Sequence, residues 1–229
     1  TNSNYAYMQF GENASFEHKF REHLRALIKA QIGDIGNLCE WEGNPYVGLS
    51  SYEFSQSDIF FGRRQLIYDT ASMMVDFQHP QVRQSLIVLG ESGSGKSSFV
   101  KAGILPFFCG SSMKESSTYE ILTPSKYGEG FRQGILDALA RQFPTLKGHP
   151  VLEEICTGKP QTKDFNYLAY ELGKADSHAL LLYIDQFEEI FTDLRIGEEE
   201  RSLILATLRG LVSTRLIHVI LSMRNDFYY

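Results

Sequence analysis

Strands that alternate with helices predict a three-layer α/β fold with a parallel sheet. Three apolar runs carry this prediction: Ser85–Leu89, Leu180–Ile184 and Leu216–Ser222. The run 180–184 is apolar at every position, as expected for a strand whose two faces are both covered by helices. Amphipathic segments, with apolar residues three or four positions apart, separate these runs, and this alternation is typical of an α/β domain.

The chain divides by composition into three parts. Residues 1–35 hold a short alternating aromatic run and an amphipathic helix over 15–31, which cannot form a core alone. Residues 36–56 are rich in glycine and serine yet contain several aromatic residues, so we expect a linker that lies against the domain after it. Residues 57–229 hold the alternating pattern, which ends just after a strand, so we expect an incomplete domain from a longer protein.

The remaining elements follow from spacing and from residues that end helices. We expect a helix over 63–77 before Pro80, and an amphipathic segment over 99–105 that Gly103 and Pro106 close. A strand is predicted over 119–122, helices over 130–143, 165–173 and 198–211, and a surface loop over 144–163.

A glycine-rich turn between the first buried strand and the next helix carries the main chemical prediction. It matches the pattern G-x-x-x-x-G-K-[ST] in its proper context, with a strand before it and a helix after it. Glycines let successive backbone N–H groups turn towards a phosphate, and the new helix adds the positive end of its dipole. The lysine would contact the β- and γ-phosphates and the next serine would bind Mg²⁺. The predicted binding residues are Gly90, Glu91, Ser92, Gly93, Ser94, Gly95, Lys96, Ser97 and Ser98.

Asp185 follows the most apolar strand, at the sheet edge where open parallel sheets place their ligands. We therefore predict that Asp185 binds Mg²⁺ directly or through water, together with Ser97. Many ATPases place a glutamate directly after this aspartate to polarise the attacking water, but here Gln186 occupies that position. The base is then predicted to be Glu188 or Glu189, the other acid interacting only with a helix dipole.

Arg224 ends the last predicted strand and faces the same crevice. A cation at this position could sense the γ-phosphate, although an arginine after a strand is often merely solvated.

Four segments together resemble the STAND class of signal-transducing P-loop ATPases, most closely its bacterial novel STAND group. They are NPYVGLSSYEFSQSDIFFGR, GESGSGKSSFVKAGILP, LLLYIDQFEEIF and VILSMRNDFYY, which span about residues 44–229. The resemblance implies a P-loop NTPase fold of the ASCE type, here truncated after the sensor strand. A further strand, a helical lid, a winged-helix domain and sensor repeats would lie beyond Tyr229.

The resemblance also implies roles for individual residues. Phe61, Gly62 and Arg63 match a hydrophobic-Gly-Arg motif near the adenine, and Arg224 matches the sensor arginine. Lys96, Glu188, Glu189 and Arg224 would then be the catalytic set. The segment YMQFGENASFEHKFREHLRAL is similar to the end of TIR-like effector domains, with an ordinary helical arm as the alternative.

The function expected from this resemblance is a switch operated by ATP and ADP with Mg²⁺. ATP hydrolysis would be slow and regulatory, and the ATP form would oligomerise and activate an N-terminal effector, in response to a ligand or protein sensed elsewhere. A role in bacterial antiviral defence would follow by analogy alone. The alternatives are an ABC-like or other mechanical ATPase, a small-molecule kinase, or a non-catalytic nucleotide-binding assembly module. The ABC alternative lacks an LSGGQ-like signature, and a GTPase is disfavoured because no NKxD motif occurs.

Net charge, cysteine spacing and the length of the apolar runs limit the kinds of partner and compartment that we expect. The net charge of −6 and the lack of a basic stripe argue against a nucleic-acid interface. The three cysteines are scattered without a CxxC pair, which predicts a reducing compartment, the cytoplasm, rather than a disulfide framework. No apolar run approaches the ~20 residues that a membrane helix needs.

Overall fold

A computed structural model describes residues 41, 44–75, 85–109, 118–174, 179–214 and 216–227. The chain divides into two units between Pro45 and Tyr46, and nearly all described residues belong to the second. The strand and helix predicted within residues 1–35, and the comparison with a TIR-like tail, lie outside the described residues.

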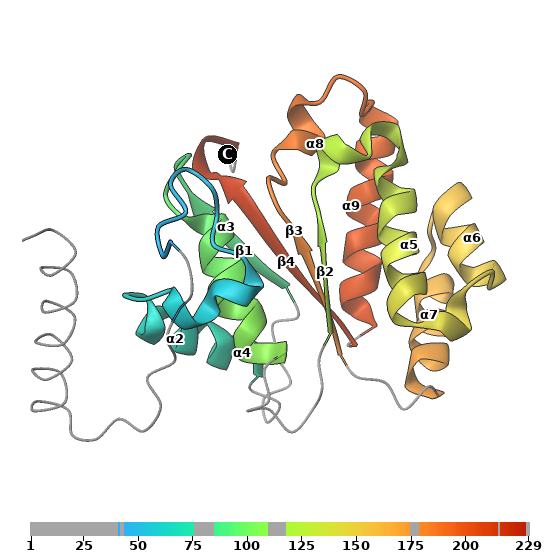
Figure 1. The fold of residues 1–229 in the computed structure, drawn as a ribbon. Helices are drawn as coiled ribbons and strands as arrows, with labels where there is room; N and C mark the ends of the chain where they lie inside the picture. Colours follow the sequence, from blue (N-terminus) through green and yellow to red (C-terminus); the bar gives the residue numbers. More distant parts are fainter. Residues whose placement is uncertain are drawn as a thin grey trace, which may run out of the picture. The chain divides into compact units, whose positions relative to one another are not determined.

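A parallel sheet of four strands forms the middle layer, in the order β1-β4-β3-β2 (Figure 1). The strands are β1 (Ser85–Gly90), β2 (Thr118–Leu122), β3 (Leu180–Ile184) and β4 (Ile217–Arg224). β4 pairs with β1 on one side and with β3 on the other, so it is central although it comes last along the chain. The predicted α/β class and parallel sheet are confirmed. Because all four strands are parallel, their carboxyl ends lie at one edge of the sheet, and the residues that follow the strands are brought together there.

Helices cover both faces of the sheet (Figure 1). One face packs on α5 (Phe131–Gln142) and α9 (Glu198–Ser213), while α6 (Pro150–Thr157) and α7 (Thr162–Lys174) pack on these two helices, and all four contribute to one apolar core. The other face packs on α2 (Arg64–Val75) and α4 (Leu105–Cys109) through a second core. Alternate residues of β3 enter the two cores, Leu182 the first and Tyr183 the second, as the two-residue period of a strand requires.

The helix after the glycine-rich turn is longer than predicted. It begins as α3 (Lys96–Ser98), widens to a π-helix over Phe99–Ile104 and continues as α4, so Gly103 and Pro106 do not close it. The Leu105 N–H donates to the carbonyl of Val100, five residues back. A proline ring clashes with the carbonyl four residues before it, and the wider turn lies where that clash would occur. Gly103 is instead a packing position, because a Cβ there would lie 2.8 Å from Ile67 Cδ1.

The prediction of a surface loop over residues 144–163 is wrong. This stretch contains a 3-10 turn, Pro144–Leu146, and helix α6, whose residues Val151, Leu152 and Ile155 enter the first core. Pro150 occupies the first helical position and the His149 ring accepts the Val151 N–H, so a proline that suggested a loop in fact begins a helix.

Short elements connect the larger ones. They are the 3-10 helices Phe54–Ile59, Pro124–Lys126, Gly128–Gly130 and Asn225–Phe227, and the single helical turn α8 (Glu189–Thr192). The turn α8 begins directly after the loop 185–188, which follows β3. A strand and a helical turn therefore fix the two ends of this loop.

Candidate nucleotide-binding site

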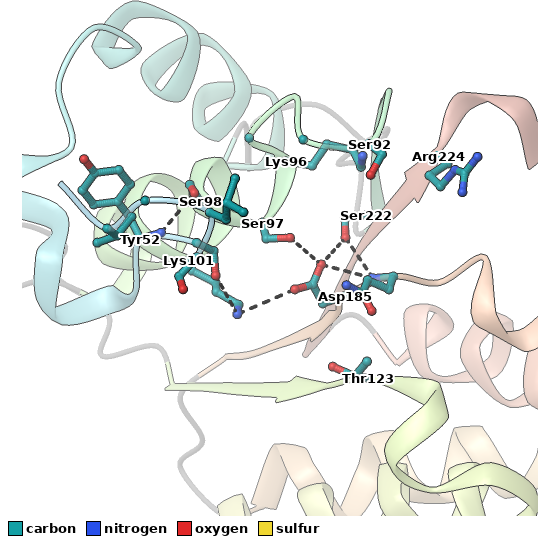
Figure 2. Close-up of a pocket in the computed structure, with 18 of the residues that line it drawn as sticks. Tyr52, Ser92, Lys96, Ser97, Ser98, Lys101, Thr123, Asp185, Ser222 and Arg224 are labelled. Atoms are coloured by element: carbon teal, nitrogen blue, oxygen red, sulfur yellow. Dashed lines mark hydrogen bonds and ion pairs between the residues drawn. The ribbon is translucent and has the colours of Figure 1, made fainter.

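A cavity of about 850 Å³ opens at the carboxyl ends of β1, β3 and β4 (Figure 2). Its walls come from the glycine-rich turn, from the loops after β2, β3 and β4, and from a segment that precedes α2. The lining residues are Tyr46, Val47, Gly48, Leu49, Ser50, Ser51, Tyr52, Ser92, Gly93, Gly95, Lys96, Ser97, Ser98, Lys101, Thr123, Ser125, Lys126, Asp185, Gln186, Glu188, Ser222 and Arg224. The position agrees with the rule that open α/β sheets bind ligands outside the carboxyl ends of their strands.

The glycine-rich turn has the backbone that its sequence predicts. Gly93 and Gly95 lie at φ of +76° and +83°, a region that L side chains rarely adopt. Gly95 is the N-cap of α3, and no side chain caps that helix end. The first amides of the helix are therefore available for an anion, as at other helix N-termini that bind phosphate. At Gly90 a Cβ would lie 2.7 Å from the Ser94 Oγ, so the turn closes tightly on the strand end.

Lys96 and Ser97 point into the cavity from the first turn of α3 (Figure 2). The Lys96 ammonium donates to the carbonyls of Gly90 at 2.9 Å and Glu91 at 2.8 Å, both in the turn itself. The Ser97 hydroxyl donates to Asp185 Oδ1 at 2.8 Å. The structure thus brings the predicted phosphate lysine, the predicted metal serine and the predicted metal aspartate to one place.

Asp185 is buried and one of its oxygens, Oδ1, accepts four hydrogen bonds. The donors are the hydroxyls of Ser97 (2.8 Å), Tyr183 (2.8 Å) and Ser222 (2.7 Å) and the Gln186 N–H (3.1 Å). The other oxygen, Oδ2, faces the Lys101 ammonium at 3.7 Å. The carboxylate is therefore fixed in orientation by its own strand, by β4 and by the helix after the turn.

These contacts determine the ionisation of Asp185. Burial alone would raise the pKa of its carboxyl, but the hydrogen bonds from Ser222, Tyr183 and Ser97 and the charge of Lys101 lower it below the ordinary value. Burial, with the neighbouring carboxylate as a second cause, raises the pKa of Tyr183, which stays a neutral donor. Asp185 is thus an anion at neutral pH, the form in which a carboxylate binds a cation.

Gln186 has φ of +56°, and among the described residues it alone combines a side chain with a positive φ. Its N–H lies between Asp185 Oδ1 and the Ser222 Oγ, 3.1 and 3.2 Å away. A left-handed residue other than glycine costs about 1–2 kcal/mol, so these contacts stabilise a backbone that the residue does not favour.

The two candidate bases separate in the structure. Glu188 lines the cavity and its carboxylate accepts the Arg224 N–H at 3.3 Å. Glu189 lies at the start of α8 and its carboxylate accepts the Ser125 N–H at 2.9 Å, where it holds the 3-10 turn after β2. Glu188 therefore faces the space where a ligand would bind, and Glu189 is occupied by a structural contact.

Arg224 ends β4 and lines the cavity, although its guanidinium forms a bidentate ion pair with Asp226 and lies 5.4 Å from the centre of the Phe227 ring. Arg63 precedes α2 and donates to the Ser94 carbonyl at 3.2 Å, so it contacts the glycine-rich turn from outside. Gly62 has φ of +89° and Phe61 is 74% exposed, and neither lines the cavity.

Some site residues were not predicted from the sequence. Tyr183 lies two positions before Asp185 and therefore on the same face of β3, and Ser222 lies near the end of the neighbouring strand. Lys101 follows Ser97 by four residues, the spacing that places two side chains on one helix face. The segment 46–52 was expected to lie against the domain, but its contact with the cavity was not, because that contact depends on the tertiary fold.

The donors present fit Mg²⁺. Ser97 and Asp185 offer a hydroxyl and a carboxylate, both hard oxygen ligands, next to the turn that would hold phosphates. Within the described ranges no group of three or more His, Cys, Asp or Glu side chains could hold a metal alone. A single carboxylate is usual for Mg²⁺ bound together with substrate phosphates. None of the helices described is long and apolar enough to span a membrane.

Comparison with known proteins finds one family and several remote structural likenesses. The model of the family described as Novel STAND NTPase 1 matches residues 45–229. Among solved structures, the ORC2 protein of Aeropyrum pernix in ADPNP–ADP complexes has a TM-score of 0.47 and 15% identity over 72% of this chain and 41% of that chain. PCH-2 of C. elegans has a TM-score of 0.40 and 12% identity over 78% of this chain and 40% of that chain. This chain thus spans about two fifths of each. A search of curated proteins found no match.

Proposed function

Because the chain belongs to the Novel STAND NTPase 1 family, a family of P-loop NTPases, we propose that it is an ATP- and ADP-binding signalling switch. ATP would be hydrolysed slowly with Mg²⁺, and the exchange of ADP for ATP would control oligomerisation and an N-terminal effector, in response to a ligand or protein sensed elsewhere. A role in antiviral defence in the cytoplasm belongs to the same proposal. Its main support is the convergence of Lys96, Ser97 and Asp185 on one cavity.

The geometry supports different roles for different residues of the cavity. The amides that open α3 and the Lys96 ammonium would bind the phosphates, with Lys96 exchanging its two carbonyl acceptors for phosphate oxygens. Ser97 and Asp185 would hold Mg²⁺, which neutralises charge on the transferred phosphoryl group when it is bound. Phe61, Gly62 and Arg63 would lie on the adenine side, since Arg63 contacts the outer side of the turn.

Glu188 is the proposed general base, because it lines the cavity whereas Glu189 holds the Ser125 amide. Arg224 is the proposed sensor of the γ-phosphate, for which its guanidinium must leave Asp226. A switch requires that ADP and ATP bind two conformations with different affinities, and the γ-phosphate is the only group that differs.

Matched glutamine variants test the proposal. Glu188→Gln should retain nucleotide but lose hydrolysis by a factor of about 10²–10⁴, the usual contribution of a general base. Glu189→Gln should keep hydrolysis and lose thermal stability, because only the contact with Ser125 is weakened. Lys96→Ala should abolish nucleotide binding. Binding can be followed with a fluorescent ADP analogue and turnover by phosphate release.

The opposite pattern would contradict the assignment. Normal turnover in Glu188→Gln would exclude this residue as the base. Retention of nucleotide by Lys96→Ala at the level of the unmodified chain would exclude the cavity as the phosphate site. The nucleotide carried through purification, identified after denaturation, tests the switch itself, because a switch held off by its product should retain ADP.

A further inference from the structure

Lys101 lies between two carboxylates that come from distant parts of the chain, and Figure 2 shows its contact with one of them, Asp185. Its ammonium is 3.7 Å from Asp185 Oδ2 and donates to Glu53 Oε1 at 3.1 Å and to the Ser51 Oγ at 3.3 Å. The side chain of Lys101 is 15% exposed, whereas that of Glu53 is 53% exposed. One half-buried cation therefore joins the proposed metal carboxylate to a segment that precedes α2.

The two oxygens of Asp185 have different surroundings. Oδ1 already accepts four hydrogen bonds, whereas Lys101 provides the positive charge that faces Oδ2. Lys101 occupies this position in the described structure, one helical turn after Ser97. A cation bound to Asp185 would therefore be repelled by the ammonium, which already donates to a second anion, Glu53.

The segment that Lys101 holds also forms a wall of the nucleotide cavity. Residues 46–52 line that cavity in an unbroken run. The segment is attached to the helix after the turn at a second point, where the Tyr52 N–H donates to the Ser98 Oγ at 3.0 Å. Lys101 and Ser98 belong to the same helical stretch as the phosphate lysine, so the wall and the phosphate site share one support.

We propose that Lys101 is an internal counter-cation of Asp185 that opposes metal binding, and that metal loading leaves it to Glu53 alone, which strengthens that contact and so fastens residues 46–53. The inference rests on the proposed function and adds a means of regulation to it. Lys101 is a positioning residue, since it acts through Asp185 and Glu53. The state of the metal site would thereby reach the segment through which the nucleotide-binding unit continues into residues 1–45.

Two substitutions, one of Lys101 and one of Glu53, should change metal affinity in opposite directions. Lys101→Met removes the competing charge, so the Mg²⁺ concentration that half-saturates binding of fluorescent ADP should fall roughly fivefold or more. Glu53→Gln removes the second anion and leaves Lys101 to Asp185 alone, so that concentration should rise by a similar factor. Lys163→Met, at an exposed position of α7, is the control for loss of a lysine charge and should change nothing.

Hydrogen exchange provides a readout that does not depend on metal affinity. In the unmodified chain with ADP, adding Mg²⁺ should slow exchange of the amides in residues 46–53 relative to the same sample with EDTA. Both Lys101→Met and Glu53→Gln should lose this difference, because each removes one partner of the contact.

A purely structural role for Lys101 predicts another result. Shifts of metal affinity in the same direction in both variants, or no shift, would overturn the inference, as would Mg²⁺-dependent protection that persists in both. If Lys101→Met does not fold, the expected rise in Glu53→Gln decides, since Glu53 is largely exposed. Failure of the unmodified chain to bind ADP would instead overturn the proposed function and the inference with it.

Discussion

The Tyr183 hydroxyl gives the sharpest test of how the protein holds its proposed metal carboxylate. Tyr183 is fully buried in β3, and its hydroxyl lies 2.8 Å from Asp185 Oδ1 and 3.0 Å from the Ser222 Oγ. Tyr183→Phe removes this one oxygen and leaves the ring in the second core. The substitution therefore isolates a hydrogen bond to a buried anion from the packing around it.

The expected loss follows from that single bond. A hydroxyl has one proton to donate, and a hydrogen bond to a charged group is worth about 1.5–3 kcal/mol. Asp185 Oδ1 keeps three other donors, so we expect a loss near the middle of this range, about 2 kcal/mol. For a folded unit of this size, 1 kcal/mol corresponds to about 2–4 °C in Tm, so the midpoint should fall by roughly 4–8 °C.

Thermal unfolding followed by circular dichroism would measure the effect, with denaturant unfolding as an independent estimate. Tyr68→Phe is the matched control, because Tyr68 is 58% exposed and removal of its hydroxyl should leave Tm unchanged. Equal midpoints for Tyr183→Phe and the control would refute the reasoning. That result would mean that the remaining donors hold Asp185 without help from the tyrosine.

Two further predictions concern positions outside the site. A Cβ at Gly210 would lie 2.0 Å from Phe165 Cε2, so Gly210→Ala should lower the free energy of unfolding by about 1–3 kcal/mol, and adding Phe165→Leu should recover part of the loss in denaturant unfolding. Burial lowers the pKa of His218, so the unfolded chain binds its proton first. Stability should fall as pH decreases below about 6.5, at up to about 1.4 kcal/mol per pH unit. His218→Leu should flatten this slope in unfolding curves measured from pH 8 to pH 5, and an unchanged slope would contradict the assignment to His218.

The sequence predicted those elements that depend on local periodicity and on strand-to-turn contacts. The four strands were placed within two residues of their observed ends because apolar runs mark buried strands directly. Lys96, Ser97 and Asp185 were placed together because parallel strands deliver their carboxyl ends to one edge.

Other features depend on tertiary contacts or on competing local signals. Pro150 and the glycines around it suggested a loop, although proline is favoured at the first position of a helix, where α6 begins. The helix continues through Pro106 because the π-helical turn accommodates the ring. The choice between Glu188 and Glu189 depends on which carboxylate the Ser125 amide takes, a contact across 64 positions that spacing alone cannot indicate.

The left-handed backbone at Gln186 bears on how chains of this kind should be aligned. Gln186 and Glu188 both line the cavity, so the first and the third residue after the aspartate face it, and only the third is an acid. An alignment that matches residues by number after the aspartate would pair Gln186 with a glutamate and conclude that the base is missing. An alignment that considers the whole turn would also include Glu188, the base proposed here.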